Sequence, residues 1–323
     1  MMSQIGGAPV TARAGMFDLQ GHRGARGLWP ENTLAGFART IDLGVCGIEL
    51  DCGVTQDGVV VVSHDPELNP DCTREEGGRF LERSGPPLIS LSYEELARYD
   101  VGRLRPGSAY AARFPLQQAV DGERIPRLAD ALTLILARGG GRVRVNIEVK
   151  SFPERPQLTP APETFVEALR CAVQQAQAAA QVSISSFDWR VLSAAQRLLP
   201  EVATGALTEQ QSGYDTVRLG SSRASPWLGG LDPQHFGGSV PRLVQATGAR
   251  TWGPDYLDLD ALRVEQAHAL GLRVVPWTVN EPADMERLLE FGVDGMISDR
   301  PDVLRALLEK QGIAVPPRTA EHS

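Results

Sequence analysis

The sequence predicts a single α/β domain folded as a (β/α)8 TIM barrel, with a small insertion after the second strand. Short runs rich in β-branched residues alternate with helical patterns along the 323-residue chain, which is typical of parallel βαβ units. Eight such runs can be distinguished, the number that closes a barrel. The length also fits, because α/β barrels commonly reach this size as one domain. We therefore expect residues 1–323 to form one closed barrel rather than an open sheet.

The expected elements follow one another in the order that a barrel requires. Strands combine apolar runs with period-two alternation, and helices repeat apolar positions every three or four residues. We place the strands at Phe17–His22, Cys46–Val54, Val143–Lys150, Val182–Ser186, Val202–Leu207, Thr251–Gly253, Arg273–Thr278 and Gly295–Ser298. We place helices at Glu31–Leu43, Leu128–Ala137, Thr164–Ala180, Arg190–Leu199, Ala261–Leu270, Pro282–Phe291 and Asp302–Lys310.

Two segments interrupt this alternation. Residues 66–127, between the hairpin of the second strand and the second helix, are rich in Gly, Pro and charge. We expect one short helix there, at Tyr93–Tyr99, and an insertion that covers one side of the barrel mouth. Residues 208–249 form a connection that carries Trp227 and Phe236; loops of this length usually bind a ligand or move. Residues 315–323 are expected to be a mobile tail.

Composition excludes several classes of function. The formal net charge of −8 argues against a nucleic-acid surface, and the sequence lacks an apolar stretch long enough to span a membrane. The segment Met1–Met16 does not have the pattern of a signal peptide. Cys46 and Cys52 share strand parity with Ile48 and Leu50, so we expect them to pack as small apolar groups rather than form disulfides or zinc sites. A cytoplasmic location is therefore expected, and the oligomeric state is left open.

The second strand and the hairpin after it bring ionisable residues together. Asp57-Gly58, flanked by strand residues, predicts a two-residue turn. Counting back from that turn places Asp51 opposite His64, with their Cβ atoms about 5 Å apart. Glu49 lies on the same face as Asp51, because every second side chain of a strand points to the same face. One hairpin is thus expected to gather two carboxylates and an imidazole.

The environment of these two acids indicates a cation. As an alternative, Glu49 and Asp51 would simply be solvated strand ends. Ile48 and Leu50, however, point toward the helix layer, so the acids must face the barrel interior. Two buried carboxylates without a partner are costly, and we infer that they bind a cation.

Two other strands add polar residues to the interior. The first strand places Gln20 and His22 on one face, with His22 at the carboxyl end, where the active sites of barrels form. The third strand aligns Asn146, Glu148 and Lys150 on one face. A lone histidine is commonly structural, but a glycine-rich turn directly after His22 favours a catalytic one. Glu148 would supply a third carboxylate and Lys150 a positive charge.

Three carboxylates without a cysteine ligand describe an all-oxygen site. Such a site suits one divalent cation, Mg²⁺ or Ca²⁺, rather than zinc. A coordination sphere open to solvent leaves room for phosphate oxygens. Arg23 and Lys150 would neutralise the remaining phosphate charge, and the arginine can bind in a bidentate fashion.

Other residues are further candidates for the site or for the core. Trp277 and Phe187 would form an apolar wall for a substrate, or else belong to the core. The stretch Pro30–Thr33 precedes a helix and is expected to cap it, and its Glu31 is a minor candidate for the site. The stretch Asp299–Pro301 has the pattern of an ordinary strand-to-helix turn. His235, His268 and His322 have no cluster of polar residues around them and are expected to be surface or helical residues.

These residues resemble the glycerophosphodiester phosphodiesterase family. The matching motifs occur in the order of that family, and together they extend from near the N-terminus to about residue 302. They are Gly21-His-Arg-Gly24, Pro30-Glu-Asn-Thr33, Ile48-Glu-Leu-Asp51, Val62-Ser-His-Asp65, Asn146-Ile-Glu-Val-Lys150, Ser185-Ser-Phe187, Trp277-Thr-Val-Asn280 and Ser298-Asp-Arg-Pro301. The resemblance also implies the barrel and its insertion after the second strand.

The resemblance implies roles for single residues and an activity. His22 and His64 would be the catalytic acid–base pair, Glu49, Asp51 and Glu148 would bind the metal, and Arg23 and Lys150 would contact the phosphate. The implied reaction is the metal-dependent hydrolysis of glycerophosphodiesters, which are small-molecule substrates, to sn-glycerol 3-phosphate and an alcohol. The nucleophile, water or a substrate hydroxyl, is left open.

Two alternatives remain at this point. A lysophospholipase D-type enzyme would act on lysophospholipids or sphingolipids, and it would need an apolar channel, for which Trp227, Phe236 and Trp277 are candidates. An inactive barrel that only binds phosphorylated ligands would belong to another class, but the presence of both histidines and all three acids argues against it.

Overall fold

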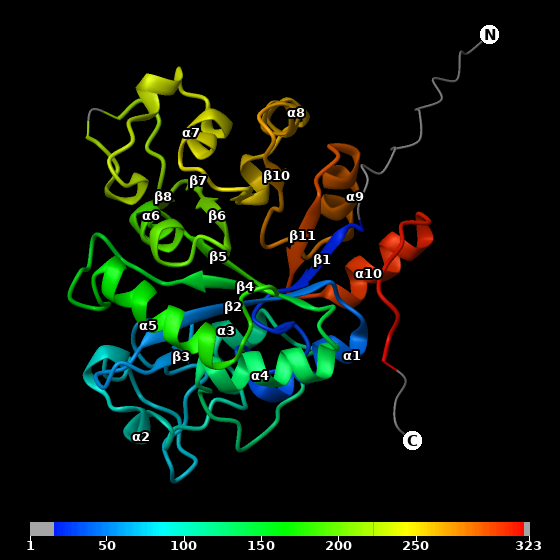
Figure 1. Cartoon of the computed structure of the whole chain (residues 1–323). Helices are drawn as coiled ribbons and strands as arrows, with labels where there is room; N and C mark the ends of the chain where they lie inside the picture. Colours follow the sequence, from blue (N-terminus) through cyan, green and yellow to red (C-terminus); the bar gives the residue numbers. More distant parts are fainter. Residues whose placement is uncertain (1–15, 222, 320–323) are drawn as a thin grey trace.

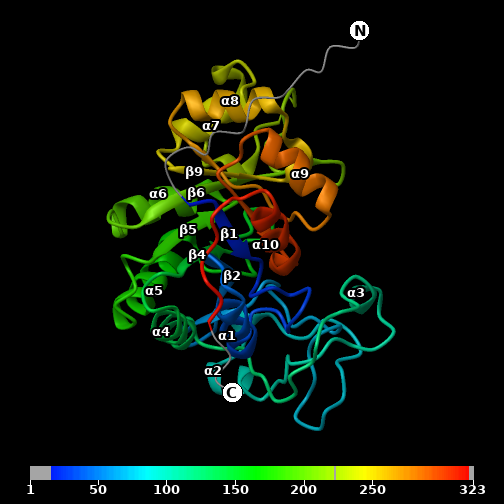
Figure 2. The same cartoon turned by 90° about the vertical axis from the view of Figure 1, so that its right-hand side faces the viewer.

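The computed structural model describes residues 16–221 and 223–319. Apart from Met16, the segment Met1–Met16 therefore lies outside the described residues. In the described ranges, eight parallel strands form a nearly closed barrel with helices around it (Figures 1 and 2). They pair in the order β10-β9-β6-β5-β4-β2-β1-β11. Their bounds are β1 Asp18–Gly21, β2 Gly47–Val54, β4 Arg144–Val149, β5 Val182–Ser186, β6 Ala203–Thr208, β9 Thr251–Pro254, β10 Arg273–Val274 and β11 Gly295–Ser298. The predicted barrel is confirmed.

The barrel closes between β10 and β11 by single backbone hydrogen bonds. Asp294 N donates to Val274 O (2.9 Å), and Ile297 N donates to Pro276 O (3.0 Å). The predicted seventh strand ran to Thr278, whereas regular pairing ends at Val274. Pro276 has no N–H to donate, which interrupts a ladder of hydrogen bonds. The chain nevertheless continues along the barrel wall to the mouth.

Helices lie on the outside of the barrel and connect successive strands (Figure 1). The first, α1, begins at Leu34 because the hydroxyl of Thr33 accepts a hydrogen bond from Gly36 N (3.1 Å) and caps it, as predicted for this stretch. The predicted α5 ran to Ala180, but the helix ends at Gln175. The helices around the barrel are α1 Leu34–Leu43, α4 Leu128–Gly139, α5 Pro162–Gln175, α6 Trp189–Leu198, α7 Val240–Ala246, α8 Ala261–Ala269, α9 Pro282–Glu290 and α10 Pro301–Lys310.

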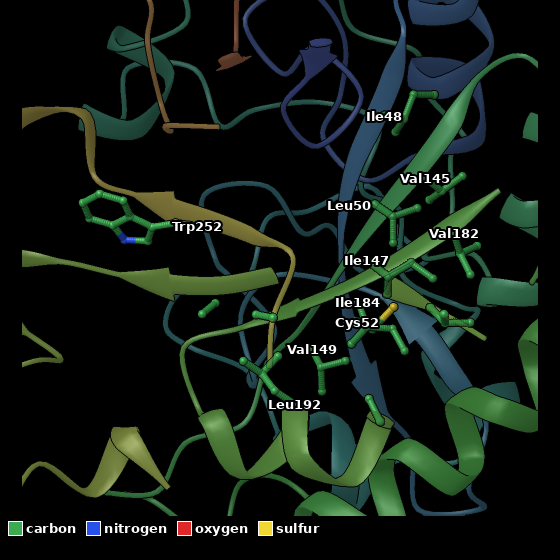
Figure 3. Packing of buried hydrophobic residues seen from close by; sticks show 14 of the residues in the cluster. Ile48, Leu50, Cys52, Val145, Ile147, Val149, Val182, Ile184, Leu192 and Trp252 are labelled. Atoms are coloured by element: carbon green, nitrogen blue, oxygen red, sulfur yellow. The ribbon is translucent and has the colours of Figure 1, made fainter. Parts of the chain in front are cut away.

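The main core lies between the strands and these helices. Every second side chain of β2 and β4 points into it, so apolar residues of both strands pack together (Figure 3). Cys46 and Cys52 belong to this core as free thiols, as predicted from their parity. Ile48 and Leu50 are fully buried. Glu49 and Asp51 alternate with these two residues along β2 and therefore face the barrel interior, as the alternation predicted.

Shortening a core side chain should destabilise the protein strongly. Ile147 of β4 is fully buried, so Ile147→Ala removes apolar contacts and leaves a cavity. We expect the free energy of unfolding to fall by about 2–5 kcal/mol, measured by urea unfolding. Leu257→Ala is the control, because Leu257 is 57% exposed and its loss should change stability by about 0.5 kcal/mol or less. Equal effects would show that Ile147 is not packed as described.

The insertion at residues 66–127 has a small core of its own. It contains η1 Leu88–Ser90, α2 Tyr93–Leu96 and α3 Ala109–Ala112. Its apolar cluster includes Leu68, Leu88, Leu96 and Ile125. The predicted helix Tyr93–Tyr99 is shorter, ending at Leu96, and Ser92 and Glu95 form a capping box at its start, a motif that satisfies the first backbone N–H groups.

Residues 208–249 lie at the other end of the molecule from the insertion, as both overall views show (Figures 1 and 2). The segment contains a hairpin of β7 Gln210–Gln211 and β8 Tyr214–Asp215, the turns η2 Pro226–Leu228 and η3 Pro233–Phe236, and α7. The sequence did not reveal α7, because seven residues are too few to establish a helical period. Phe236 packs against the main core.

The C-terminal tail contacts the body of the barrel where it is described. Thr319 N donates to Asp42 O (3.1 Å), and Arg305 Nη1 donates to Pro316 O (2.6 Å). The mobility expected for residues 315–323 stays a prediction, and 320–323 lie outside the described residues. None of the described helices combines the length and the apolar character that crossing a membrane requires.

Candidate active site

The residues predicted from separate strands meet in a pocket of about 360 Å³. His22, Lys150 and Phe187 directly follow barrel strands, whereas Glu49 and Glu148 lie within β2 and β4. Asp51 lies next to this lining, within the carboxylate cluster described below. The lining includes His22, Arg23, Glu49, His64, Glu148, Lys150, Phe187 and Trp277.

Three carboxylates come together because β2 and β4 are parallel neighbours. Their register pairs Glu49 with Asn146 and Asp51 with Glu148. Side chains on neighbouring strands at the same level share a face, so the three acids point into the barrel together. One carboxylate oxygen from each of Glu49, Asp51 and Glu148 lies within 4.8 Å of the others, and all three residues are buried.

Two positively charged side chains lie among these acids. Lys150 Nζ is 3.0 Å from Asp51 Oδ1 and 2.6 Å from Glu148 Oε1. Arg23 Nε is 3.2 Å from Asp51 Oδ2, while Arg23 Nη1 is 2.9 Å from the carboxylate of Glu31. Within the described residues, the carboxylate of Glu49 accepts one hydrogen bond, from the backbone N–H of Arg23 (3.0 Å). Negative charge therefore exceeds positive charge in the cluster.

The pKa values of the acids reflect this imbalance. Burial raises the pKa of Glu49 well above its usual value, and the charges of Asp51 and Glu148 add to the shift. Burial also raises the pKa of Glu148, although Lys150 opposes it. Burial acts on Asp51 in the same direction, but Lys150 and Arg23 outweigh it and hold its pKa well below the usual range. Glu49 is thus the acid that most lacks a positive partner.

The residues present fit a divalent cation. Oδ1 of Asp51 is buried and accepts no hydrogen bond from the described residues, although the ion pair with Lys150 is close. A buried acceptor without a hydrogen bond is unusual unless a bound ion or water molecule interacts with it. The donor atoms are three carboxylate oxygens, the hard ligands that Mg²⁺ and Ca²⁺ prefer. Glu49, Asp51 and Glu148 would hold the ion.

His22 is oriented by a carboxylate on the far side of its ring. Its Nδ1 is 2.6 Å from Asp299 Oδ1, and its Nε2 is 3.8 Å from Glu49 Oε2. Asp299 also accepts hydrogen bonds from Arg26 Nε (2.7 Å) and Asn280 Nδ2 (2.8 Å). Burial and the charge of Arg26 lower the pKa of His22 to about 4. The ring is therefore neutral near pH 7, with Nε2 on the side of the acids.

The hairpin after β2 differs from the one predicted. β3 (Val60–Val62) pairs with β2 so that Cys52 faces Val62. Ser63 N donates to Asp51 O (3.0 Å). Asp51 thus lies opposite Ser63, and the predicted pairing of Asp51 with His64 is wrong by one residue.

The turn explains this error. Thr55 N donates to Val59 O (3.0 Å), and Gly58 has a φ of +79°. These features define a three-residue loop that ends in a left-handed glycine, another common hairpin connection. The extra residue shifts the register by one position.

His64 reaches the pocket although the register differs. Regular pairing ends at Val62, so the chain leaves the strand before His64. Nδ1 of His64 is 2.7 Å from Asp65 Oδ1, an arrangement like that of His22 and Asp299. Burial and the charges of Arg23 and Lys150 lower the pKa of His64 to about 4. Its side chain is 32% exposed at the pocket.

Sequence reasoning missed several residues of the site. Asp299 lies in the turn between β11 and α10, as interpreted from the sequence, but its carboxylate also contacts His22, which that interpretation missed. Its position directly after β11, at the carboxyl end of a barrel strand, was a usable signal. Asn32 donates to Asp51 Oδ2 (2.9 Å), and Tyr110 of the insertion donates to Glu31. Nothing in the sequence pattern indicated these two contacts.

Aromatic rings form another side of the pocket. Phe187 and Trp277 meet edge to face, with ring centroids 5.4 Å apart. The indole N–H of Trp277 donates to Gly253 O (2.9 Å), which fixes the orientation of the ring. Both residues are half-buried and line the pocket rather than the main core. Contact with a substrate stays a prediction.

Comparisons with known proteins identify the family of this chain. The model of the glycerophosphoryl diester phosphodiesterase family matches residues 22–303. The chain is 32% identical to a glycerophosphodiester phosphodiesterase of Caldanaerobacter subterraneus subsp. tengcongensis, over 90% of this chain and 97% of that protein. It is 28% identical to a glycerophosphodiester phosphodiesterase of Bacillus subtilis, over 87% and 83%.

Solved structures have the same fold. A crystal structure from Silicibacter pomeroyi, assigned to the glycerophosphoryl diester phosphodiesterases, has a TM-score of 0.83 and 33% identity, and covers 95% of this chain and 97% of that one. An Oleispira antarctica phosphodiesterase in complex with the product sn-glycerol-3-phosphate has a TM-score of 0.64 and 22% identity, and covers 91% and 97%. The chain therefore belongs to the glycerophosphoryl diester phosphodiesterase family of phosphoric diester hydrolases.

Proposed function

We propose that this protein hydrolyses glycerophosphodiesters to sn-glycerol 3-phosphate and an alcohol. The observation that carries the proposal is the pair of histidines in one pocket, each with a carboxylate at Nδ1, beside three buried carboxylates. A neutral imidazole held in this way can accept a proton at Nε2 or, once protonated, donate one. The product in the Oleispira antarctica phosphodiesterase supports the choice of substrate.

Positive side chains are placed to bind the phosphate. Three positively charged side chains line the pocket, namely Arg23, Arg26 and Lys150. They would neutralise the negative charge on the two non-bridging oxygens of the phosphodiester. A cation held by Glu49, Asp51 and Glu148 would supply further electrostatic stabilisation of charge on the phosphoryl group. The identity of that cation, Mg²⁺ or Ca²⁺, is part of the proposal.

The two histidines divide the proton transfers. One removes the proton of the nucleophile, which is water or the neighbouring hydroxyl of the glycerol unit. The other donates a proton to the alcohol oxygen as its bond to phosphorus breaks. When the glycerol hydroxyl attacks, a cyclic phosphate forms first and water opens it with the histidine roles reversed. His22 and His64 are the only histidines in the described lining of the pocket.

A panel of phosphodiesters tests the proposal. Glycerophosphocholine, glycerophosphoethanolamine and lysophosphatidylcholine would each be assayed with Mg²⁺, with Ca²⁺ and with EDTA. We expect release of sn-glycerol 3-phosphate from the first two, and loss of nearly all turnover in EDTA that either ion restores. Undiminished activity in EDTA would contradict the cation, and binding of these compounds without turnover would identify an inactive phospho-ligand-binding barrel.

The lysophospholipase D-type alternative has one structural observation in its favour. Trp227 and Trp277 line the pocket and offer apolar surface, although Phe236, the third candidate, packs against the main core instead. Faster turnover of lysophosphatidylcholine than of glycerophosphocholine in the same panel would favour this alternative. The cytoplasmic location expected from the sequence stays a prediction.

A further inference from the structure

Four aromatic rings from four different segments converge on the pocket. Phe187 follows β5, Tyr214 belongs to β8, Trp227 to η2, and Trp277 follows β10. Ring centroids are 5.9 Å apart for Phe187–Tyr214, 6.5 Å for Phe187–Trp227 and 5.6 Å for Tyr214–Trp227. The planes cross at 72–89°. The four rings therefore pack edge to face around one end of the pocket.

An acid without a partner stands beside these rings. Glu209 follows β6 and lines the same pocket. Among the described residues, its carboxylate makes no hydrogen bond or ion pair. Burial and the charges of Asp255, Asp258 and Asp215 raise its pKa to about 7. A cation bound next to Glu209 would relieve this repulsion and keep the carboxylate ionised.

We propose that this aromatic end of the pocket, formed by Phe187, Tyr214, Trp227, Trp277 and Glu209, binds the quaternary ammonium group of the leaving alcohol. The preferred substrates would then be glycerophosphodiesters of choline-type alcohols. The faces of Trp, Tyr and Phe attract quaternary ammonium ions, which cannot donate hydrogen bonds to water and so are less strongly hydrated than primary ammonium ions. The inference rests on the proposed function, because it names the alcohol that the same reaction releases.

The other charges around this end of the pocket do not favour an anionic headgroup. Arg155 lines the pocket but is exposed, and its guanidinium stacks over Phe152 at 5.0 Å from the ring centroid. Glu154 next to it pairs with Arg218. Glu209 lies five residues before Tyr214 and lines the same pocket as the rings. A positive headgroup therefore meets a negative and aromatic surface.

A pair of substrates of the same shape isolates the effect of the charge. Glycerophosphocholine would be compared with its neutral carbon analogue, the 3,3-dimethylbutyl ester of glycerol 3-phosphate. We expect kcat/KM to be about tenfold higher for the choline ester, within the range of partly desolvated cation–π contacts. Equal values for the two esters would overturn the proposal.

Variants of the pocket should remove this preference. Glu209→Gln keeps the shape and removes the charge, and Tyr214→Leu removes one ring at a side chain that is 38% exposed. Each should lower the choline preference several-fold, because the choline ester should lose more kcat/KM than the neutral ester. Glu201→Gln is the matched control, because Glu201 is exposed and lies before β6, whereas Glu209 lies after it. A preference that is unchanged in both pocket variants would contradict the proposed site.

A binding measurement separates this proposal from the proposed function. Calorimetry with tetramethylammonium and with uncharged neopentyl alcohol needs no turnover. Tighter binding of tetramethylammonium to the wild type, weakened in Glu209→Gln, supports the ammonium site even if no glycerophosphodiester is hydrolysed. Turnover of both esters without discrimination, together with equal binding of the two small molecules, would leave the hydrolase intact and overturn the ammonium site.

Discussion

Replacing His22 by alanine is expected to lower kcat by about 10²–10⁴-fold, the usual contribution of a positioned acid–base group. The same loss is expected for His64→Ala, because both rings open onto one pocket and each has a carboxylate at Nδ1. KM should change less than kcat, since a proton-transfer group acts mainly in the transition state. Initial rates with glycerophosphocholine at saturating cation would measure both parameters.

The control for this prediction is another histidine of the same chain. His235 is exposed on η3 and lies outside the described lining of the pocket. His235→Ala should retain the wild-type kcat within about twofold. Circular dichroism of all three variants would verify that they fold. Near-normal kcat in His22→Ala or His64→Ala would remove that histidine from the mechanism.

Glu49→Gln is expected to weaken binding of the divalent cation at least tenfold. The substitution keeps the volume of the side chain and removes the carboxylate that most lacks a positive partner. Calorimetric titration with Mg²⁺ and Ca²⁺ would measure the affinity directly. Because an ion that binds only the folded state stabilises it by about 2.7 kcal/mol at 100 times its Kd, saturating cation should also raise Tm of the wild type and raise that of Glu49→Gln much less.

A second glutamate variant makes the cation result specific. Glu201→Gln removes one negative charge from an exposed position before β6, so it tests the effect of net charge alone. We expect its cation affinity and its Tm shift to match those of the wild type. Unchanged affinity in Glu49→Gln would show that the three acids do not form the ion site.

The sequence predicted the faces of the strands well. Ile48 and Leu50 pack outward under the helices, and Glu49 and Asp51 point inward, as the alternation indicated. This prediction is reliable because the direction of a side chain in a strand depends only on its position along that strand.

Predictions across strands were less successful. The hairpin was placed one residue out of register, because the three-residue loop around Gly58 and a two-residue turn are compatible with the same Asp-Gly pair. The link from His22 to Asp299 joins residues 277 positions apart, and no local pattern reports it. The contact of Tyr110 with Glu31 likewise depends on how the insertion folds over the barrel mouth.

The sequence by itself determined the barrel and the inward direction of the acids, because these follow from short periods along single strands; the roles of both histidines stay predictions. The tertiary structure decided which carboxylate orients each histidine, how Lys150 and Arg23 share the acids, and that Tyr214, Trp227 and Glu209 join the pocket. Those relations depend on barrel closure and on loops whose path is set by packing against distant residues. Such contacts have no fixed spacing in the sequence, so only the folded chain reveals them.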